Sequence, residues 1–343
     1  MAKKKPTAID LFSGCGGLTQ GLRMAGFRVI GAVEIDDLAA KTYKANHTTV
    51  KVWRKDIREL SLRKVKQQLK LRRGDLDLLA GCPPCQGFST MRSLNGKRSV
   101  EDERNNLIFQ FLRFVCELLP KTIMMENVPG LRDDQRYASF LAALRALGYE
   151  HIDEGVRNAK FYGVPQSRRR LILMASRVAP VSAPARDEQM KTVRQFIENL
   201  PPAGTSKDPA HDLPERRSDK VKKLISLIPK DGGSRSQLPK DLQLDCHKKC
   251  DGFKDVYGRL SWDKVSTTIT GGCFNPSKGR FLHPQEDRCI TLREAALLQS
   301  FPRNYRFPNV SKKQEVALMI GNALPPEMIK RFATAVRMAV VPE

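Results

Sequence analysis

The sequence lacks a long apolar stretch: nothing in it approaches the ~18 consecutive apolar residues that a membrane-spanning helix needs. The N-terminal run Met1 to Lys5 begins like a secretory signal, but Asp10 and a glycine-rich stretch interrupt the apolar segment that should follow. Eight cysteines are scattered through 343 residues without the dense spacing of a disulfide scaffold. We therefore expect a soluble cytoplasmic protein with reduced thiols.

Acidic residues are scarce beside basic ones. The chain has 37 Asp and Glu against 60 Lys and Arg, a formal net charge of +23. Basic residues are especially dense between Lys51 and Arg73. Such an excess favours a polyanionic partner, because each neutralised phosphate releases condensed counterions. A basic, solubilising surface is the alternative interpretation.

Apolar patterns of strand and helix type alternate through the first half of the chain. We expect strands at residues 7–12, 29–33, 50–52, 76–80 and 123–125, and helices at 18–26, 37–45, 61–71, 105–118 and 136–147. Two further strand-like runs follow at 150–157 and 171–175. This alternation predicts an α/β fold with a doubly wound, mostly parallel sheet.

The pattern of apolar residues changes after about residue 178. Repeated prolines and charged residues replace the periodic apolar pattern, which is typical of an irregular second domain. Helical patterns return at 291–299, 312–320 and 326–340.

A glycine-rich turn follows the first predicted strand. It contains Gly14, Gly16 and Gly17, and an acidic residue, Glu34, ends the next strand. Glycines allow the backbone to approach a ligand, and a carboxylate can accept hydrogen bonds from ribose hydroxyls, so the pattern fits a nucleotide-type site. The spacing is not the full dinucleotide fingerprint, and a tight turn in another α/β fold is the alternative.

Chemically active residue types follow two more predicted strands and precede a third. The run G-C-P-P-C-Q-G-F-S occupies 81–89, M-E-N-V-P-G at 125–130 presents Glu126, and Q-S-R-R-R at 166–170 supplies Arg168 and Arg170. Ligands of open α/β sheets bind outside the carboxyl ends of the strands. Cysteine, carboxylate and arginine at one edge of one sheet therefore predict a reactive site.

The cysteines in this region have other interpretations. A cysteine at a strand end can be a nucleophile, a metal ligand or a small apolar side chain. Cys82 and Cys85 have C-x-x-C spacing and could form a zinc site with Cys246 and Cys250. Two prolines separate the first pair and the second pair is one residue too wide for a tight knuckle, so we expect no metal. A thioredoxin-like redox pair is disfavoured by the flanking fold signals.

Taken in order, the motifs resemble the DNA (cytosine-5-)-methyltransferase family of bacterial or phage type over nearly the whole chain. The resemblance rests on D-L-F-S-G-C-G-G (10–17), E-I-D (34–36), D-I (56–57), P-P-C-Q-G-F-S (83–89), E-N-V (126–128), Q-S-R-R-R (166–170), R-C-I-T-L-R-E-A-A (288–296) and G-N-A-L-P-P (321–326).

The resemblance implies transfer of a methyl group from S-adenosyl-L-methionine to carbon 5 of a cytosine flipped out of double-stranded DNA. It implies that Cys85 attacks carbon 6, that Glu126 binds and protonates the base, and that Arg168 and Arg170 complete the catalytic set. Arg168 is the positive group that we expect beside the thiolate.

The resemblance also assigns binding residues. For the cofactor these are Phe12, Ser13, Gly14, Gly16, Gly17, Glu34, Ile35, Asp56, Ile57, Leu107 and Asn322, and for DNA they are Gln86, Ser89, Arg92, Gln166 and Arg288. It implies a catalytic and cofactor-binding domain of residues 1–178 plus 318–343, and a smaller target-recognition domain of residues 179–317. The expected enzyme acts as a monomer without an obligatory protein partner, in a restriction-modification system or as an orphan or phage modification enzyme.

Three other functions were weighed. One branch of the same family methylates RNA, but its cysteine-phenylalanine-threonine signature is absent here, since Asn275 follows Cys273 and Phe274. A catalytically silent relative should have lost Cys85, Glu126 or the glycines, and all are present. A nicotinamide-dependent oxidoreductase should carry a pyrophosphate fingerprint, which residues 13–18 lack.

Overall fold

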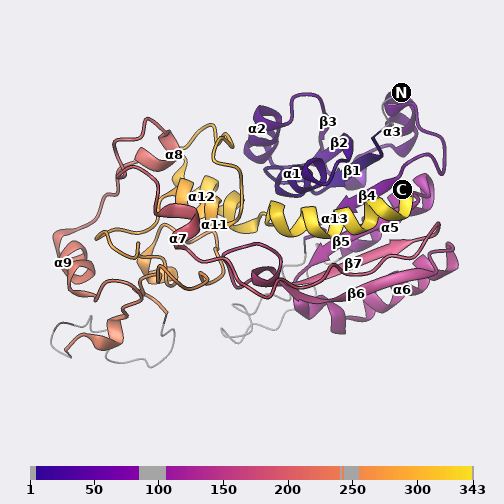
Figure 1. Ribbon diagram of the computed structural model, residues 1–343. Helices are drawn as coiled ribbons and strands as arrows, with labels where there is room; N and C mark the ends of the chain where they lie inside the picture. Colours follow the sequence, from indigo (N-terminus) through magenta and orange to yellow (C-terminus); the bar gives the residue numbers. More distant parts are fainter. Residues whose placement is uncertain (1–4, 85–105, 240–241, 243–254, 342–343) are drawn as a thin grey trace. The chain divides into compact units, whose positions relative to one another are not determined.

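The computed structural model describes residues 5–84, 106–239, 242 and 255–341 (Figure 1). The described chain forms two compact units. The first comprises the residues up to 158, residues 169–186 and those from 324 onward; the second comprises 159–168 and 187–323. The predicted domain boundaries near residues 178 and 318 stay a prediction; the compact units divide at 186 and 324 and assign residues 159–168 to the second unit.

The first unit is built on a seven-stranded sheet with the order β3-β2-β1-β4-β5-β7-β6. The strands are β1 (Thr7–Leu11), β2 (Arg28–Glu34), β3 (Lys51–Arg54), β4 (Leu78–Gly81), β5 (Thr122–Asn127), β6 (His151–Asn158) and β7 (Arg169–Ser176). The pairs from β3 through to β5 are parallel, whereas β7 runs antiparallel to both β5 and β6. The predicted α/β class and mostly parallel sheet are confirmed.

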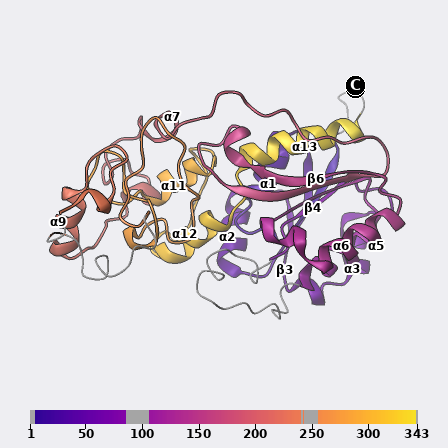
Figure 2. The same ribbon diagram turned by 90° about the horizontal axis from the view of Figure 1, so that it is seen from below.

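Helices cover both faces of this sheet (Figures 1 and 2). On one face α13 (Pro326–Val340) packs along α1 (Gly17–Met24), and α2 (Asp37–Asn46) adjoins α1. The other face carries α3 (Leu62–Leu69), α5 (Leu107–Leu118) and α6 (Gln135–Ala146). Short 3-10 turns η1 (Ile57–Glu59) and η4 (Pro129–Asp133) follow β3 and β5.

In the part of the chain that the structure describes, no helix combines the length and apolar character needed to cross a membrane.

The main core of the first unit lies between the sheet and the second helix layer. Phe111 and Phe114 of α5 and Phe140 of α6 are fully buried against strand residues such as Ile9 and Leu79. The Phe111 and Phe140 rings meet edge to face with their centroids 6.0 Å apart, a favoured aromatic geometry. Burial of this apolar surface stabilises the sheet, whose parallel strands have their carboxyl ends at the same edge.

The second unit contains short elements joined by irregular chain, as its proline-rich sequence predicts. Its helices are α7 (Arg194–Ile197), α8 (Pro209–Asp212), α9 (Asp219–Leu227), α11 (Leu292–Leu298) and α12 (Lys313–Asn322), with 3-10 turns η5 (Ala159–Phe161), η6 (Arg235–Gln237) and η8 (Pro276–Lys278). A buried arginine, Arg259, ties the irregular segments together by donating to the carbonyls of Ile225, Ile228 and His283. One guanidinium satisfies several carbonyls that lack a ladder partner.

The contact of α1 with α13 depends on a glycine. A Cβ on Gly21 would lie 2.5 Å from the Ile329 Cβ and 2.7 Å from the Pro326 carbonyl oxygen. Because both distances are below van der Waals contact, only glycine allows α13 to lie this close to α1. The glycine thereby lets α13 pack directly against α1.

We therefore expect Gly21→Ala to lower the free energy of unfolding by about 1–3 kcal/mol, the usual penalty for overpacking. Urea denaturation of the purified protein measures this change. Met24→Ala, on the exposed side of the same helix, is the matched control and should change stability by less than about 0.5 kcal/mol. Equal effects of the two substitutions would contradict the close-packing argument.

Candidate active site

The predicted site residues of the first unit gather at the carboxyl edge of its sheet. The loop from Phe12 to Gly17 follows β1, Glu34 ends β2, Asp56 follows β3, and Cys82 follows β4. Strand order reverses between β1 and β4, so this edge contains the topological switch point where open α/β sheets bind ligands.

The glycine loop has a backbone that most residues cannot adopt. Gly14 and Gly16 have φ values of 54° and 98°, and Phe12 also has a positive φ of 60°. The Ser13 amide donates to the Val33 carbonyl at 3.0 Å, which anchors the loop to β2. A left-handed conformation at Gly16, immediately before α1, turns the chain sharply from strand to helix.

Glu34 is held against this loop by two backbone amides. One carboxylate oxygen accepts from the Gly14 N–H at 2.7 Å and the other accepts from the Asp36 N–H at 2.8 Å. Burial raises the pKa of Glu34, and the two N–H donors oppose that rise. The carboxylate is therefore fixed in place, with lone pairs left on both oxygens for further donors.

The other predicted cofactor residues have diverse surroundings. Ile35 is 65% exposed beside Glu34, whereas Ile57 is buried. The Arg58 side chain hydrogen-bonds both oxygens of Asp56 and lowers its pKa. Leu107 begins α5 and packs against the main core. Asn322 is the last residue of α12, in the second unit, so its contact with the cofactor stays a prediction.

Glu126 and Arg170 form an ion pair at the end of β5. The Arg170 Nε lies 2.9 Å from a Glu126 carboxylate oxygen, and both side chains are largely buried. The pairing follows from the antiparallel register: Glu126 lies opposite Ile172, and Arg170, two residues before Ile172, lies on the same face of the sheet. A buried carboxylate is costly without such a partner.

Two neighbours of this pair were missed by the sequence analysis as site residues. The Cys82 thiol hydrogen-bonds Glu126, and burial followed by the Glu126 charge raises the pKa of Cys82 far above its usual value. Asn127 is buried and its amide donates to the Pro83 carbonyl at 2.9 Å. Asn127 therefore fastens the chain at Pro83, just after β4, to β5. Only its position after Glu126 in the motif could have indicated this role.

Arg168, predicted to lie beside the catalytic thiolate, hydrogen-bonds backbone carbonyls of the second unit. Its guanidinium is buried in the second unit, where it donates to the Ile269 carbonyl at 3.1 Å and to the Gly321 carbonyl at 2.9 Å. The resemblance implied that Arg168 is the positive group beside the thiolate of Cys85. β7 begins at Arg169, and Arg168 belongs to the second unit. Because Cys85 lies outside the described residues, the placement of Arg168 beside its thiolate stays a prediction. Arg170 is the arginine that faces the carboxylate.

Two residues predicted to contact DNA, Gln166 and Arg288, form hydrogen bonds within the second unit. Gln166 is fully buried, donating to Gln299 and Leu298 and accepting from the Ile269 amide. The Arg288 guanidinium is shared between the carboxylates of Glu286 and Glu294. Neither side chain offers its donors to an external ligand in this arrangement, and both instead stabilise the second unit.

Four predicted site residues, Cys85, Gln86, Ser89 and Arg92, lie outside the described residues, as do Cys246 and Cys250 of the alternative zinc site. Their predicted roles therefore stay predictions.

The family model "C-5 cytosine-specific DNA methylase" matches residues 7–337. The chain belongs to this family. It is a DNA (cytosine-5-)-methyltransferase, and the family predicted from the motifs is confirmed.

Relatives of this methyltransferase cover it almost completely. The type II methylase M.HgiDII of Herpetosiphon aurantiacus is 35% identical over 96% of the chain and 94% of its own length. Type II methyltransferase M1.HphI of Haemophilus parahaemolyticus is 31% identical over 96% of the chain and 86% of its own length. Among solved structures, a protein described as a DNA modification methyltransferase of an Escherichia coli prophage superposes with a TM-score of 0.69 at 26% identity, covering 98% of this chain and 99% of its own.

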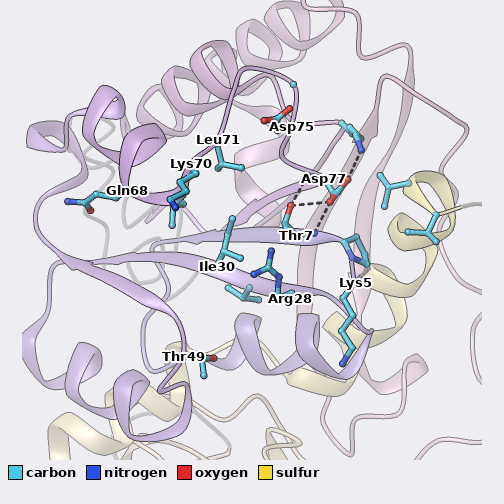
Figure 3. Close-up of a pocket in the computed structure, with 17 residues that line it drawn as sticks. Lys5, Thr7, Arg28, Ile30, Thr49, Gln68, Lys70, Leu71, Asp75 and Asp77 are labelled. Atoms are coloured by element: carbon cyan, nitrogen blue, oxygen red, sulfur yellow. Dashed lines mark hydrogen bonds and ion pairs between the residues drawn. The ribbon is translucent and has the colours of Figure 1, made fainter. Parts of the chain in front are cut away.

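A cavity of about 910 Å³ lies at the other edge of the sheet (Figure 3). Thr7, Arg28 and Asp77, at or just before the first residues of three strands, line it. Asp77 is occupied within the protein, since it accepts from the Thr7 amide and hydroxyl and pairs with Lys121. The cavity is therefore separate from the carboxyl edge that carries Glu34 and Glu126.

A buried carboxylate, Asp10, lies near the end of β1 just before the loop. One of its oxygens accepts from the Thr19 hydroxyl at 2.7 Å, and the other has no hydrogen-bond partner among the described residues. Burial raises the pKa of Asp10 from 3.8 to about 8. Between these two values the folded protein binds a proton that the unfolded chain does not, so this group's contribution to stability falls as the pH rises.

Asp10→Asn mimics the protonated acid and does not titrate. We expect the melting temperature of the variant, relative to the wild type, to increase from pH 5 to pH 8 and to level off above pH 8. Thermal denaturation of the cofactor-free proteins across this range measures the difference. A difference that does not change with pH would show that Asp10 is ionised in the folded state throughout.

Proposed function

We propose that this methyltransferase moves the methyl group of S-adenosyl-L-methionine to carbon 5 of a flipped-out cytosine in a specific double-stranded DNA sequence, through a covalent Cys85 adduct at carbon 6. The observation that carries the proposal is the buried Glu126–Arg170 pair at the carboxyl edge of the same sheet as the glycine loop, in a chain of this family.

The proposed chemistry follows from the weakness of cytosine carbon 5 as a nucleophile. Attack of the Cys85 thiolate on carbon 6 makes the ring enamine-like, and carbon 5 can then accept the methyl group. Loss of the carbon 5 proton and departure of Cys85 complete the cycle. Since a free thiol with a pKa of ~8.5 is only a few per cent ionised at neutral pH, a positive environment must assist this step.

Glu126 is proposed to hydrogen-bond ring nitrogen 3 and the exocyclic amine, and to supply a proton to nitrogen 3 as electron density moves into the ring. Arg170 holds this carboxylate with one nitrogen at 2.9 Å and leaves further guanidinium donors for the base or its backbone. The arginine thus fixes the acid's orientation before the base arrives, which lowers the reorganisation that the reaction needs.

The residues of the loop fit the proposed cofactor. Glu34 keeps acceptor capacity for ribose hydroxyls after binding the Gly14 and Asp36 amides. Ile35 is an exposed apolar side chain beside it, suited to one face of an adenine ring. Asp10 contributes a buried oxygen without a hydrogen-bond partner near the loop. When bound, the cofactor would supply an electrophilic methyl group.

The proposed DNA substrate and restriction-modification context rest on charge and on the relatives. The net charge of +23 suits a polyphosphate partner. The relatives are type II methylases, which is why a specific recognition sequence is proposed. The second unit is proposed to contain the target-recognition residues, and the enzyme is proposed to act as a monomer in the bacterial or phage-infected cytoplasm.

Bisulfite sequencing of plasmid DNA from cells that express the wild type or Cys85→Ala tests the reaction. We expect protected cytosines in one short recurring context with the wild type and none with the variant. Methylation by soluble Cys85→Ala would contradict the nucleophile assignment. Protected cytosines in cellular RNA, with none in DNA, would contradict the substrate.

Arg170→Gln tests the arginine that faces Glu126. Removing a preorganised charged donor should lower the single-turnover rate by about 10²–10³, and Glu126→Gln should slow the reaction similarly. Rapid-quench measurement of methyl transfer at saturating DNA gives these rates.

Arg168→Met is the comparison variant. It should mainly lower thermal stability, because it leaves two buried carbonyls unpaired. A larger rate loss for folded Arg168→Met than for Arg170→Gln would show that Arg168, and not Arg170, is the arginine that serves the reaction.

A further inference from the structure

His47 is a fully buried histidine that the proposed chemistry does not use. It follows the last residue of α2, and its ring packs against Tyr43 with centroids 4.8 Å apart. Its Nε2 lies 3.3 Å from the carbonyl oxygen of Gly16 in the cofactor loop. On the other side of the ring, the Arg23 Nη1 lies 3.1 Å from Nδ1. The ring therefore connects an arginine of α1 to the glycine loop.

The two partners determine the protonation state of the ring. A guanidinium can only donate hydrogen bonds and a carbonyl can only accept them. Nδ1 must therefore carry the lone pair and Nε2 the proton, which is one tautomer of the neutral imidazole. The environment agrees: burial, and then the Arg23 charge, lower the pKa of His47 to about 4.

The contact gives the Gly16 carbonyl a second hydrogen-bond partner. Gly16 has a φ of 98° and no side chain to restrict it. Its carbonyl accepts from the Gln20 amide at 2.9 Å, the first hydrogen bond of α1, and from His47 on the side of α2. Because the peptide unit is planar, fixing this carbonyl also fixes the direction of the Gly17 N–H.

The surrounding groups hold the ring in place. The Thr19 hydroxyl of α1 lies 2.8 Å from the Tyr43 hydroxyl and donates to Asp10 of β1. Arg23 also donates to the Asn46 carbonyl at 3.4 Å. The titratable or charged groups around His47 are thus Arg23 on α1, Tyr43 on α2 and, through Thr19, Asp10 on β1.

We propose that Arg23 and His47 are positioning residues for the cofactor: Arg23 selects the tautomer of His47, and His47 holds the Gly16 carbonyl so that the loop keeps its binding conformation. This inference rests on the proposed function, in which the loop binds S-adenosyl-L-methionine. In this proposal Arg23 and His47 act through the Gly16 carbonyl and contact neither the cofactor nor the base.

His47→Phe keeps the aromatic packing and removes the donor. We expect its dissociation constant for S-adenosyl-L-methionine to rise about tenfold, the effect of one lost buried hydrogen bond, with the rate at saturating cofactor and the affinity for DNA within about twofold of the wild type. Equilibrium dialysis with tritiated cofactor and no DNA measures the binding. Tyr149→Phe is the matched control: it removes a buried hydroxyl that donates to the Pro120 carbonyl at 2.6 Å, away from the loop, and should leave cofactor binding unchanged.

Arg23→Ala is the second variant, and since Arg23 is exposed we expect it to fold. Without Arg23 the neutral ring can adopt the other tautomer, which presents a lone pair to Gly16. Burial, the larger cause of the lowered pKa of His47, remains in the variant, so the ring stays neutral at pH 6 as at pH 8. The variant should therefore bind the cofactor several-fold more weakly than the wild type at both pH values. Comparison with the wild type at each pH removes the contribution of Asp10.

These measurements distinguish failure of the proposed function from failure of the role proposed for His47 and Arg23. No cofactor binding by the wild type would overturn the proposed function. Binding by the wild type with unchanged affinity in folded His47→Phe or in folded Arg23→Ala would overturn the role of His47 and Arg23.

Discussion

The ion pair between Glu126 and Arg170 is the interaction on which the site depends. A carboxylate at a strand end, largely removed from water, is stable only with a charged or hydrogen-bonded partner. The fold supplies that partner through the antiparallel return of β7, which places Arg170 on the face of Glu126. If β7 were another parallel strand, its first residues would lie at the opposite edge of the sheet. The one antiparallel insertion among the central strands is thus what completes the site.

The remaining site parts are arranged around this edge by the parallel strands. Backbone amides fix Glu34, Asn127 fastens the chain at Pro83, and the buried His47, which follows α2, hydrogen-bonds the glycine loop. Glu126 and Arg170 lie in strands, whereas the glycine loop and the chain at Pro83 are irregular and are held by hydrogen bonds from neighbouring strands. Preorganisation of this kind is what allows a loop-built site to act without large rearrangement.

The fold of the first unit was predictable because its strands are short, apolar and separated by well-patterned helices. Every predicted strand and helix of that unit has a counterpart, with ends shifted by a few residues. Glu34 and Glu126 could be placed at one edge from strand polarity alone. Arg168 could not be distinguished from Arg170, because alternation gives both the same face and only the point where β7 begins separates them. The contacts of Gln166 and Arg288 with DNA stay predictions. In the second unit these side chains hydrogen-bond a carbonyl and carboxylates that are distant or buried in the fold, and the sequence does not indicate those partners. His47 carried no sequence signal, since its role arises from two residues distant along the chain.

The central claim is that Glu126 and Arg170 prepare a base for covalent attack by Cys85. DNA containing 5-fluorocytosine at the target position tests this most directly, because fluorine cannot leave carbon 5 as a cation in the way a proton does, so the covalent adduct accumulates. Incubation with S-adenosyl-L-methionine, followed by mass spectrometry that localises the modified cysteine, should show the methylated base on Cys85 in the wild type and strongly delayed adduct formation in Arg170→Gln. An adduct on Cys82, or no adduct with a protein that methylates ordinary DNA, would contradict the account.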